Sequence, residues 1–72
     1  MDYKLVMNTA VLAGEMMLRS GAETYRVEDT MYHILRTAQT ETVEASVMMT
    51  GIVATISNPD MEPVSYTHLP AH

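Results

Sequence analysis

The chain has 72 residues, no cysteine and a formal net charge of −5. An acidic chain repels phosphate backbones, which excludes nucleic acid as an expected partner, and without cysteine no disulfide can stabilise the fold. Hydrophobic residues make up 47% of the chain, a content that argues against disorder and predicts one small folded domain.

The first predicted helix covers residues 3–20, with Asp2 placed to cap its start. From Leu5 onward, apolar residues recur at spacings of three and four, and further apolar residues widen the stripe beyond one face. Gly14 lies inside this helix and could allow another backbone to approach closely, whereas Gly21 is placed to end it in a left-handed conformation. The apolar run is interrupted by polar residues and falls short of the ~18–20 apolar residues that a membrane span needs.

The second predicted helix covers residues 22–38. Ser20 and Glu23 fit the capping-box pattern, in which a serine and a glutamate three residues later satisfy the first backbone N–H groups. Thr24 is an alternative cap. One apolar stripe at helical spacing consists of Val27, Met31, Ile34, Leu35 and Ala38.

After the helices the apolar period changes from near 3.6 to 2, which predicts strands at about 42–49 and 52–57 and a possible third from residue 62. Thr50 and Gly51 form a plausible tight turn, with the glycine supplying a positive φ. We therefore expect an α+β fold in which two antiparallel helices pack on a small antiparallel sheet.

The segment Ser20-Gly-Ala-Glu-Thr-Tyr-Arg-Val-Glu-Asp-Thr30 resembles the N-terminal domain of the threonine/serine exporter family, and the resemblance extends over residues 14–56. It implies a soluble, cytoplasmic domain ahead of a transmembrane bundle, in a bacterial cell-membrane protein that exports small polar metabolites such as threonine or serine. We expect residues 1–64 to be part of that domain, in an accessory or gating role. The expected partners are the transmembrane domain, the metabolite and further subunits of an oligomer; no cofactor is implied.

The resemblance ends near Val64, after which the family would continue with a further strand. Residues 65–72 instead read Ser-Tyr-Thr-His-Leu-Pro-Ala-His. They resemble the tails that arise when sequencing-adapter DNA is translated at the end of a gene fragment. We expect a non-native or disordered tail at 65–72, and sequencing the source gene across codons 60–75 tests this.

The candidate substrate-binding residues lie in the family segment. Arg26 is flanked by Glu23 and Glu28, and its guanidinium has the five donors that suit the carboxylate of an amino acid. Tyr25 is the neighbour that helix formation alone does not explain. The alternative for Arg26 is an ion-pair network with the nearby acids.

The remaining polar residues predict no catalytic site. Asp29 and His33 lie four apart on one helix face, but a metal site needs a third ligand, so a solvated polar face is the preferred interpretation. No nucleophile motif and no phosphate-binding loop is present. Two alternatives to the exporter interpretation stay open: part of a hydrolase-like enzymatic domain completed by other residues, and a structural interaction module with methionine-rich docking faces.

Overall fold

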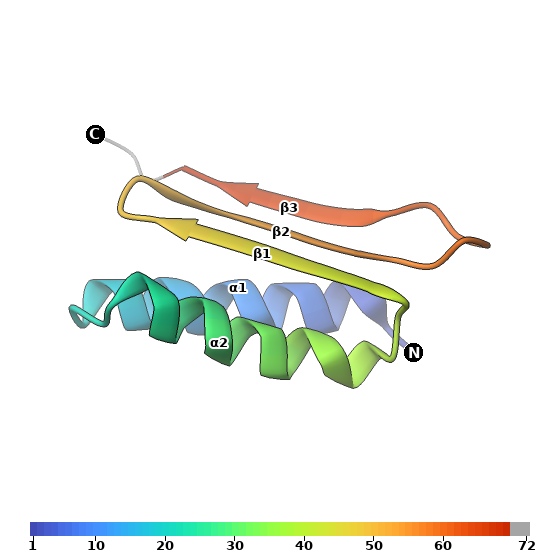
Figure 1. The fold of residues 1–72 in the computed structure, drawn as a ribbon, viewed down its shortest axis with the longest axis horizontal. Helices are drawn as coiled ribbons and strands as arrows, with labels where there is room; N and C mark the ends of the chain where they lie inside the picture. The colour runs from blue at the N-terminus through green and yellow to red at the C-terminus, as the bar shows by residue number, and fades with distance from the viewer. Residues whose placement is uncertain (70–72) are drawn as a thin grey trace.

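The computed structural model describes residues 1–69. Two helices form one layer, and an antiparallel sheet with strand order β1-β2-β3 forms the other (Figure 1). This arrangement confirms the predicted α+β fold. The elements are α1 (Tyr3–Arg19), α2 (Thr24–Leu35), the 3-10 helix η1 (Arg36–Ala38), β1 (Thr42–Met48), β2 (Gly51–Ser57) and β3 (Val64–His68).

The core lies between the helix layer and the central strand. The predicted stripe of α2 is buried there, with Ile34 at its partly buried margin. In this layer α2 packs mainly on β1 and α1 on β2 and β3, and the strands bury alternate residues against the helices, as a period of 2 requires. The buried core consists of Met7, Ala10, Val11, Val27, Met31, Leu35, Ala38, Val47, Ile52, Ala54 and Ile56. The opposite face of the sheet is mostly polar and exposed, which gives the two-layer pattern.

Gly14 explains how α1 approaches the core so closely. A Cβ added at this position would lie 2.7 Å from Sδ of Met31 and 3.2 Å from Cδ1 of Ile52. The close approach is therefore made by side chains of α2 and β2, and not by another backbone as the sequence suggested. An alanine would need a displacement of the fully buried Met31.

The α1–α2 connection confirms the expected role of Gly21 and corrects that of Ser20. Gly21 has φ of 84°, and its N–H donates to the Leu18 carbonyl while the N–H of Ala22 donates to that of Met17. These are the two hydrogen bonds of a Schellman motif. The hydroxyl of Ser20 donates back to the Met16 carbonyl, so it belongs to the end of α1 and forms no capping box.

The N-cap of α2 is Glu23, which makes no side-chain capping bond, and the helix begins at Thr24. The capping-box prediction was wrong because the left-handed glycine that ends α1 uses the same residues that the pattern assigned to the start of α2.

Gly51, in the β1–β2 hairpin, does not have the positive φ that the sequence predicted. Gly51 is the first residue of β2, and the positive φ values in residues 1–69 are those of Gln39 and Gly21. A Cβ at Gly51 would lie 2.7 Å from the backbone oxygen of His68 and 2.9 Å from Cδ2 of Leu69. The glycine is thus explained by the close approach of β3 and not by turn geometry.

Strand β3 includes residues 65–68, which the sequence assigned to a tail. It pairs antiparallel with β2 from Val64 opposite Ile56 to His68 opposite Ile52. Residues 70–72 of the predicted tail lie outside the described residues. The foreign origin of the segment stays a prediction that sequencing the gene tests.

Candidate functional site

Arg26 and Tyr25 lie together on the exposed first turn of α2. Nε of Arg26 donates to the Tyr25 hydroxyl at 3.4 Å, and its Cζ lies 6.0 Å from the centroid of the Tyr25 ring. Tyr25 is 60% exposed. Because the aromatic ring holds only part of the guanidinium, the remaining N–H donors face solvent and can meet an external carboxylate.

The predicted ion-pair network around Arg26 is not formed. Within residues 1–69, the contacts of a carboxylate with a basic side chain are those of His33 with Asp29 and of His68 with Glu15, and neither involves Arg26. The nearby acids therefore do not occupy Arg26 in this structure. This removes the main structural explanation for the arginine.

Glu23 and Glu28 have different positions relative to Arg26. Glu23 is exposed at the N-cap, and its backbone carbonyl accepts the N–H of Arg26 at 3.0 Å. Glu28 points across to the sheet, where Oε2 accepts the backbone N–H of Val47 at 2.9 Å. The structure therefore brings the side chains of Tyr25 and Arg26 together, joins Glu23 to Arg26 through the backbone, and engages the carboxylate of Glu28 elsewhere.

Tyr32 makes a second hydrogen bond from α2 to β1, next to that of Glu28. Its hydroxyl accepts the backbone N–H of Ala45 at 3.3 Å. Four helical residues rise about 6 Å and two strand residues about 6.6–6.8 Å, so Glu28 and Tyr32, four apart on α2, match Val47 and Ala45, two apart on the oppositely directed β1. The sequence contains this signal as two acceptor side chains four apart, but it shows its meaning only once the strand is known to lie beside the helix.

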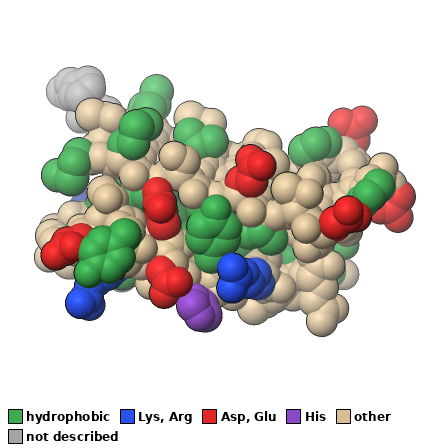
Figure 2. All heavy atoms as spheres, in the orientation of Figure 1, with side chains coloured by type: hydrophobic (Ala, Val, Ile, Leu, Met, Phe, Trp, Pro, Cys, Tyr) green, Lys and Arg blue, Asp and Glu red, His purple; other side chains and the backbone are tan. Residues whose placement is uncertain are grey.

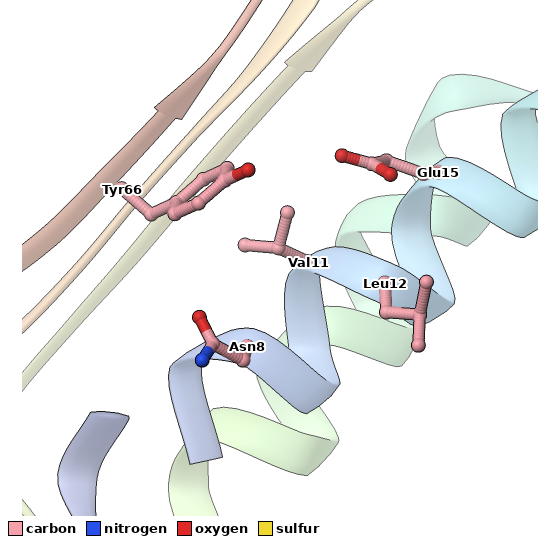
Figure 3. Close-up of a pocket in the computed structure, with 5 residues that line it drawn as sticks. All are labelled: Asn8, Val11, Leu12, Glu15 and Tyr66. Atoms are coloured by element: carbon pink, nitrogen blue, oxygen red, sulfur yellow. The ribbon is translucent and has the colours of Figure 1, made fainter. Parts of the chain in front are cut away.

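A second feature that the sequence did not predict is a hollow between α1 and β3. It has a volume of about 280 Å³ and is lined by Asn8, Val11, Leu12, Glu15 and Tyr66. Figure 3 shows the Tyr66 ring extending from β3 toward α1, with its hydroxyl on the side of Glu15. Leu12, at the rim, is 59% exposed. The hollow is small and largely apolar, so it suits an apolar side chain better than a charged metabolite.

Glu15, which lines the hollow, also contacts His68. Oε1 of Glu15 lies 3.1 Å from Nδ1 of His68, and both side chains are partly buried. The His68 ring stacks on Tyr66, with centroids 6.4 Å apart. The carboxylate of Glu15 therefore has a polar partner within the chain, the imidazole of His68.

Asp29 and His33 lie together on an exposed face of α2. Nδ1 of His33 lies 2.8 Å from the backbone oxygen of Asp29 and 3.8 Å from its carboxylate. The ring nitrogen thus interacts first with the helix backbone. Residues 1–69 contain no group of three histidine, aspartate or glutamate side chains placed to hold a metal ion.

Comparison with known proteins identifies a family. A family model described as putative threonine/serine exporter matches residues 8–70, which is most of the chain. Comparison with curated proteins gave no significant match, and neither did comparison with solved structures. In the described part of the chain, no helix combines the length and apolar character that crossing a membrane requires.

Proposed function

The chain belongs to the putative threonine/serine exporter family, and we propose that it is part of an N-terminal accessory or gating domain on the cytoplasmic side of such an exporter. The full-length protein would lie in the cell membrane, with its transport pathway formed by transmembrane helices outside these residues. The domain would assist the export of a small polar metabolite such as threonine or serine.

The observation that carries the proposed role is the arrangement of Arg26 and Tyr25. Arg26 is exposed at the start of α2, is steadied by the Tyr25 ring, and has no carboxylate partner among residues 1–69. A guanidinium of this kind suits the carboxylate of an amino acid, which it can bind through two parallel hydrogen bonds. Glu23, the exposed N-cap residue of α2, would meet the amino group of the same ligand.

Glu28 is a weaker candidate than the other three residues for binding the metabolite. Its carboxylate accepts the N–H of Val47, so binding a metabolite would require that hydrogen bond to be exchanged. We therefore assign the contact with the metabolite to Arg26, Tyr25 and Glu23, with Glu28 holding α2 against the sheet.

The test is threonine efflux from cells that express the full-length exporter carrying Arg26→Ala. Arg36→Ala is a matched control, because Arg36 is also exposed and stacks on a tyrosine, with Cζ 5.6 Å from the centroid of the Tyr32 ring. We expect Arg26→Ala to reduce efflux and Arg36→Ala to leave it unchanged. Arg26→Lys should be nearly as impaired as Arg26→Ala, because lysine keeps the charge but loses the planar fork.

Equal efflux from the wild-type and Arg26→Ala proteins, at equal amounts in the membrane, would show that Arg26 has no part in transport. Loss of efflux in both arginine variants would indicate a general effect on folding of the helix and would also count against the proposed binding role.

A further inference from the structure

We propose that α1 pairs with α1 of a second copy of the chain, antiparallel and about a two-fold axis, through an apolar stripe on its outer face. The stripe consists of Leu5, Leu12 and Met16, with Met1 just before the helix. The surface belongs to residues 1–20, so the proposal is separate from the role of Arg26.

The stripe lies on the side of α1 that faces away from the core. The residues that α1 buries in the core are Met7, Ala10, Val11 and Gly14. The three helical residues of the stripe are instead each 58–61% exposed. Because seven and eleven residues complete about two and three turns, Leu5, Leu12 and Met16 lie in one line along the helix. Exposed apolar side chains scattered singly need no explanation, but a line of them along a helix is the pattern of a helix–helix contact.

The spacing along the stripe is the same in both directions. The steps between its successive members, from Met1 to Met16, are four, seven and four residues. When two such helices pair antiparallel about a two-fold axis, Leu5 of each copy meets Leu12 of the other, and the two methionines meet in the same way. A two-fold dimer requires a surface that is complementary to itself. The spacing therefore favours a second copy over an unrelated partner.

Two charged residues beside the stripe favour the antiparallel direction. Lys4 and Glu15 are eleven residues apart and so lie on the same flank of α1. The two-fold axis brings this flank against the same flank of the second copy. There Lys4 and Glu15 of the other copy differ in level by two residues, about 3 Å along the helix axis, so their side chains can meet. In a parallel pair, Lys4 would face Lys4 and Glu15 would face Glu15, which is repulsive.

The surface of α1 is the part of this acidic chain on which two copies can meet without strong repulsion. Residues 1–20 contain two acidic and two basic residues, so the net charge of −5 lies entirely in the rest of the chain. Figure 2 shows the face on which α2 lies, with acidic side chains spread over it and fewer basic ones. Like charges repel across an interface, so pairing through that face is disfavoured while pairing through α1 is not.

The size of the stripe predicts a weak dimer. A standard interface buries about 800 Å² on each partner, and a single stripe on a helix of 17 residues is smaller than that. We therefore expect pairing at high concentrations of the chain. Pairing would be stronger where copies are held side by side in one membrane, an expectation that rests on the proposed function.

Single cysteines test the pairing directly, because the chain has none of its own. The midpoint of the stripe lies between Asn8 and Thr9. At a helix–helix distance of about 8–10 Å, Asn8 therefore lies within disulfide range of Asn8 of the second copy. Arg19 is the matched control, because it is exposed on the same face but would lie about 32 Å from Arg19 of the second copy. We expect Asn8→Cys to form a disulfide-linked dimer on mild oxidation at least about tenfold faster than Arg19→Cys.

Lysine substitutions test whether the stripe drives the pairing. Leu5→Lys in the Asn8→Cys chain should slow cross-linking to the rate of Arg19→Cys, because a charge then replaces a leucine at the contact. Met49→Lys is the control, because it adds the same charge at an exposed apolar residue outside the stripe. It should not slow cross-linking. Circular dichroism checks that all of these exposed substitutions leave the fold intact.

Three results would overturn the proposal. Equal cross-linking through Asn8→Cys and Arg19→Cys would indicate parallel or random association. Cross-linking that Leu5→Lys does not slow would show that the stripe is not the contact. The third is absence of the Asn8→Cys cross-link in the full-length protein in its membrane, with any other cysteines removed; lipid or another segment of the same polypeptide would then cover the stripe. Threonine efflux is not measured here, so a failure of this proposal is distinguishable from a failure of the Arg26 test.

Discussion

The Glu28 carboxylate on α2 accepts a hydrogen bond from the backbone N–H of Val47 on β1, with 2.9 Å between Oε2 and the nitrogen. This contact joins the helix layer to an edge strand across 19 residues of sequence. Together with the hydroxyl of Tyr32 on Ala45, it satisfies backbone donors that an edge strand would otherwise leave open.

Removing the Glu28 carboxylate should destabilise the fold. Val47 is buried, and Glu28→Ala leaves its N–H without an acceptor, at a cost of about 1–3 kcal/mol. Glu28→Gln keeps an acceptor oxygen on a side chain of the same length and should lose much less. The free energy of unfolding in urea measures both. Equal losses in the two variants would show that the charge, and not the hydrogen bond to Val47, is what matters.

Tyr32→Phe should open the β1 edge at Ala45 while leaving the ring in place. We expect a loss of about 0.5–1.5 kcal/mol and faster amide exchange at Ala45 in particular. Tyr25→Phe is the control, because the hydroxyl of Tyr25 contacts only Arg26 at 3.4 Å and no strand backbone in the described residues. If both phenylalanine variants leave exchange at Ala45 unchanged, the hydroxyl of Tyr32 does not protect the edge.

Gly14→Ala tests the close packing of α1 on Met31. Alanine favours the helix by about 1 kcal/mol over glycine, but its Cβ would lie 2.7 Å from Sδ of a side chain that is fully buried. Overpacking of this kind costs about 1–3 kcal/mol, so we expect a net loss of stability of about 1 kcal/mol.

The control for Gly14 is a double-mutant cycle with Met31→Val, which removes the sulfur atom. Side chains in contact couple by about 0.5–3 kcal/mol, so the double variant should be more stable than the sum of the single changes implies. Additive effects would mean that Gly14 and Met31 do not share a steric constraint.

The sequence predicted those features that depend on local periodicity. The stripe from Val27 to Ala38 and the alternation in β1 and β2 correspond to the observed elements, because burial on one side of a helix or sheet imposes these periods. Gly21 was predictable because a helix end often requires a left-handed residue.

The features that the sequence missed depend on contacts between elements. Glu28 was grouped with Arg26 by proximity in sequence, yet the rotation of the helix directs it to Val47. The hollow between Glu15 and Tyr66 combines residues from opposite ends of the chain, so no local pattern could indicate it. The pairing of strands decides such sites, and periodicity does not encode which strand lies beside which helix.

Gly51 illustrates the same limit and gives the last prediction. The turn pattern suggested a positive φ, but the structure places Gly51 in β2 with the backbone oxygen of His68 2.7 Å from where a Cβ would be. Gly51→Ala should therefore displace the end of β3 and destabilise the fold by about 1–3 kcal/mol, with chemical-shift changes centred on His68. Placing D-alanine at position 51 by chemical synthesis separates the two explanations, because a D-residue is favoured at positive φ. A stabilising effect of D-alanine together with unchanged shifts at His68 would restore the turn explanation.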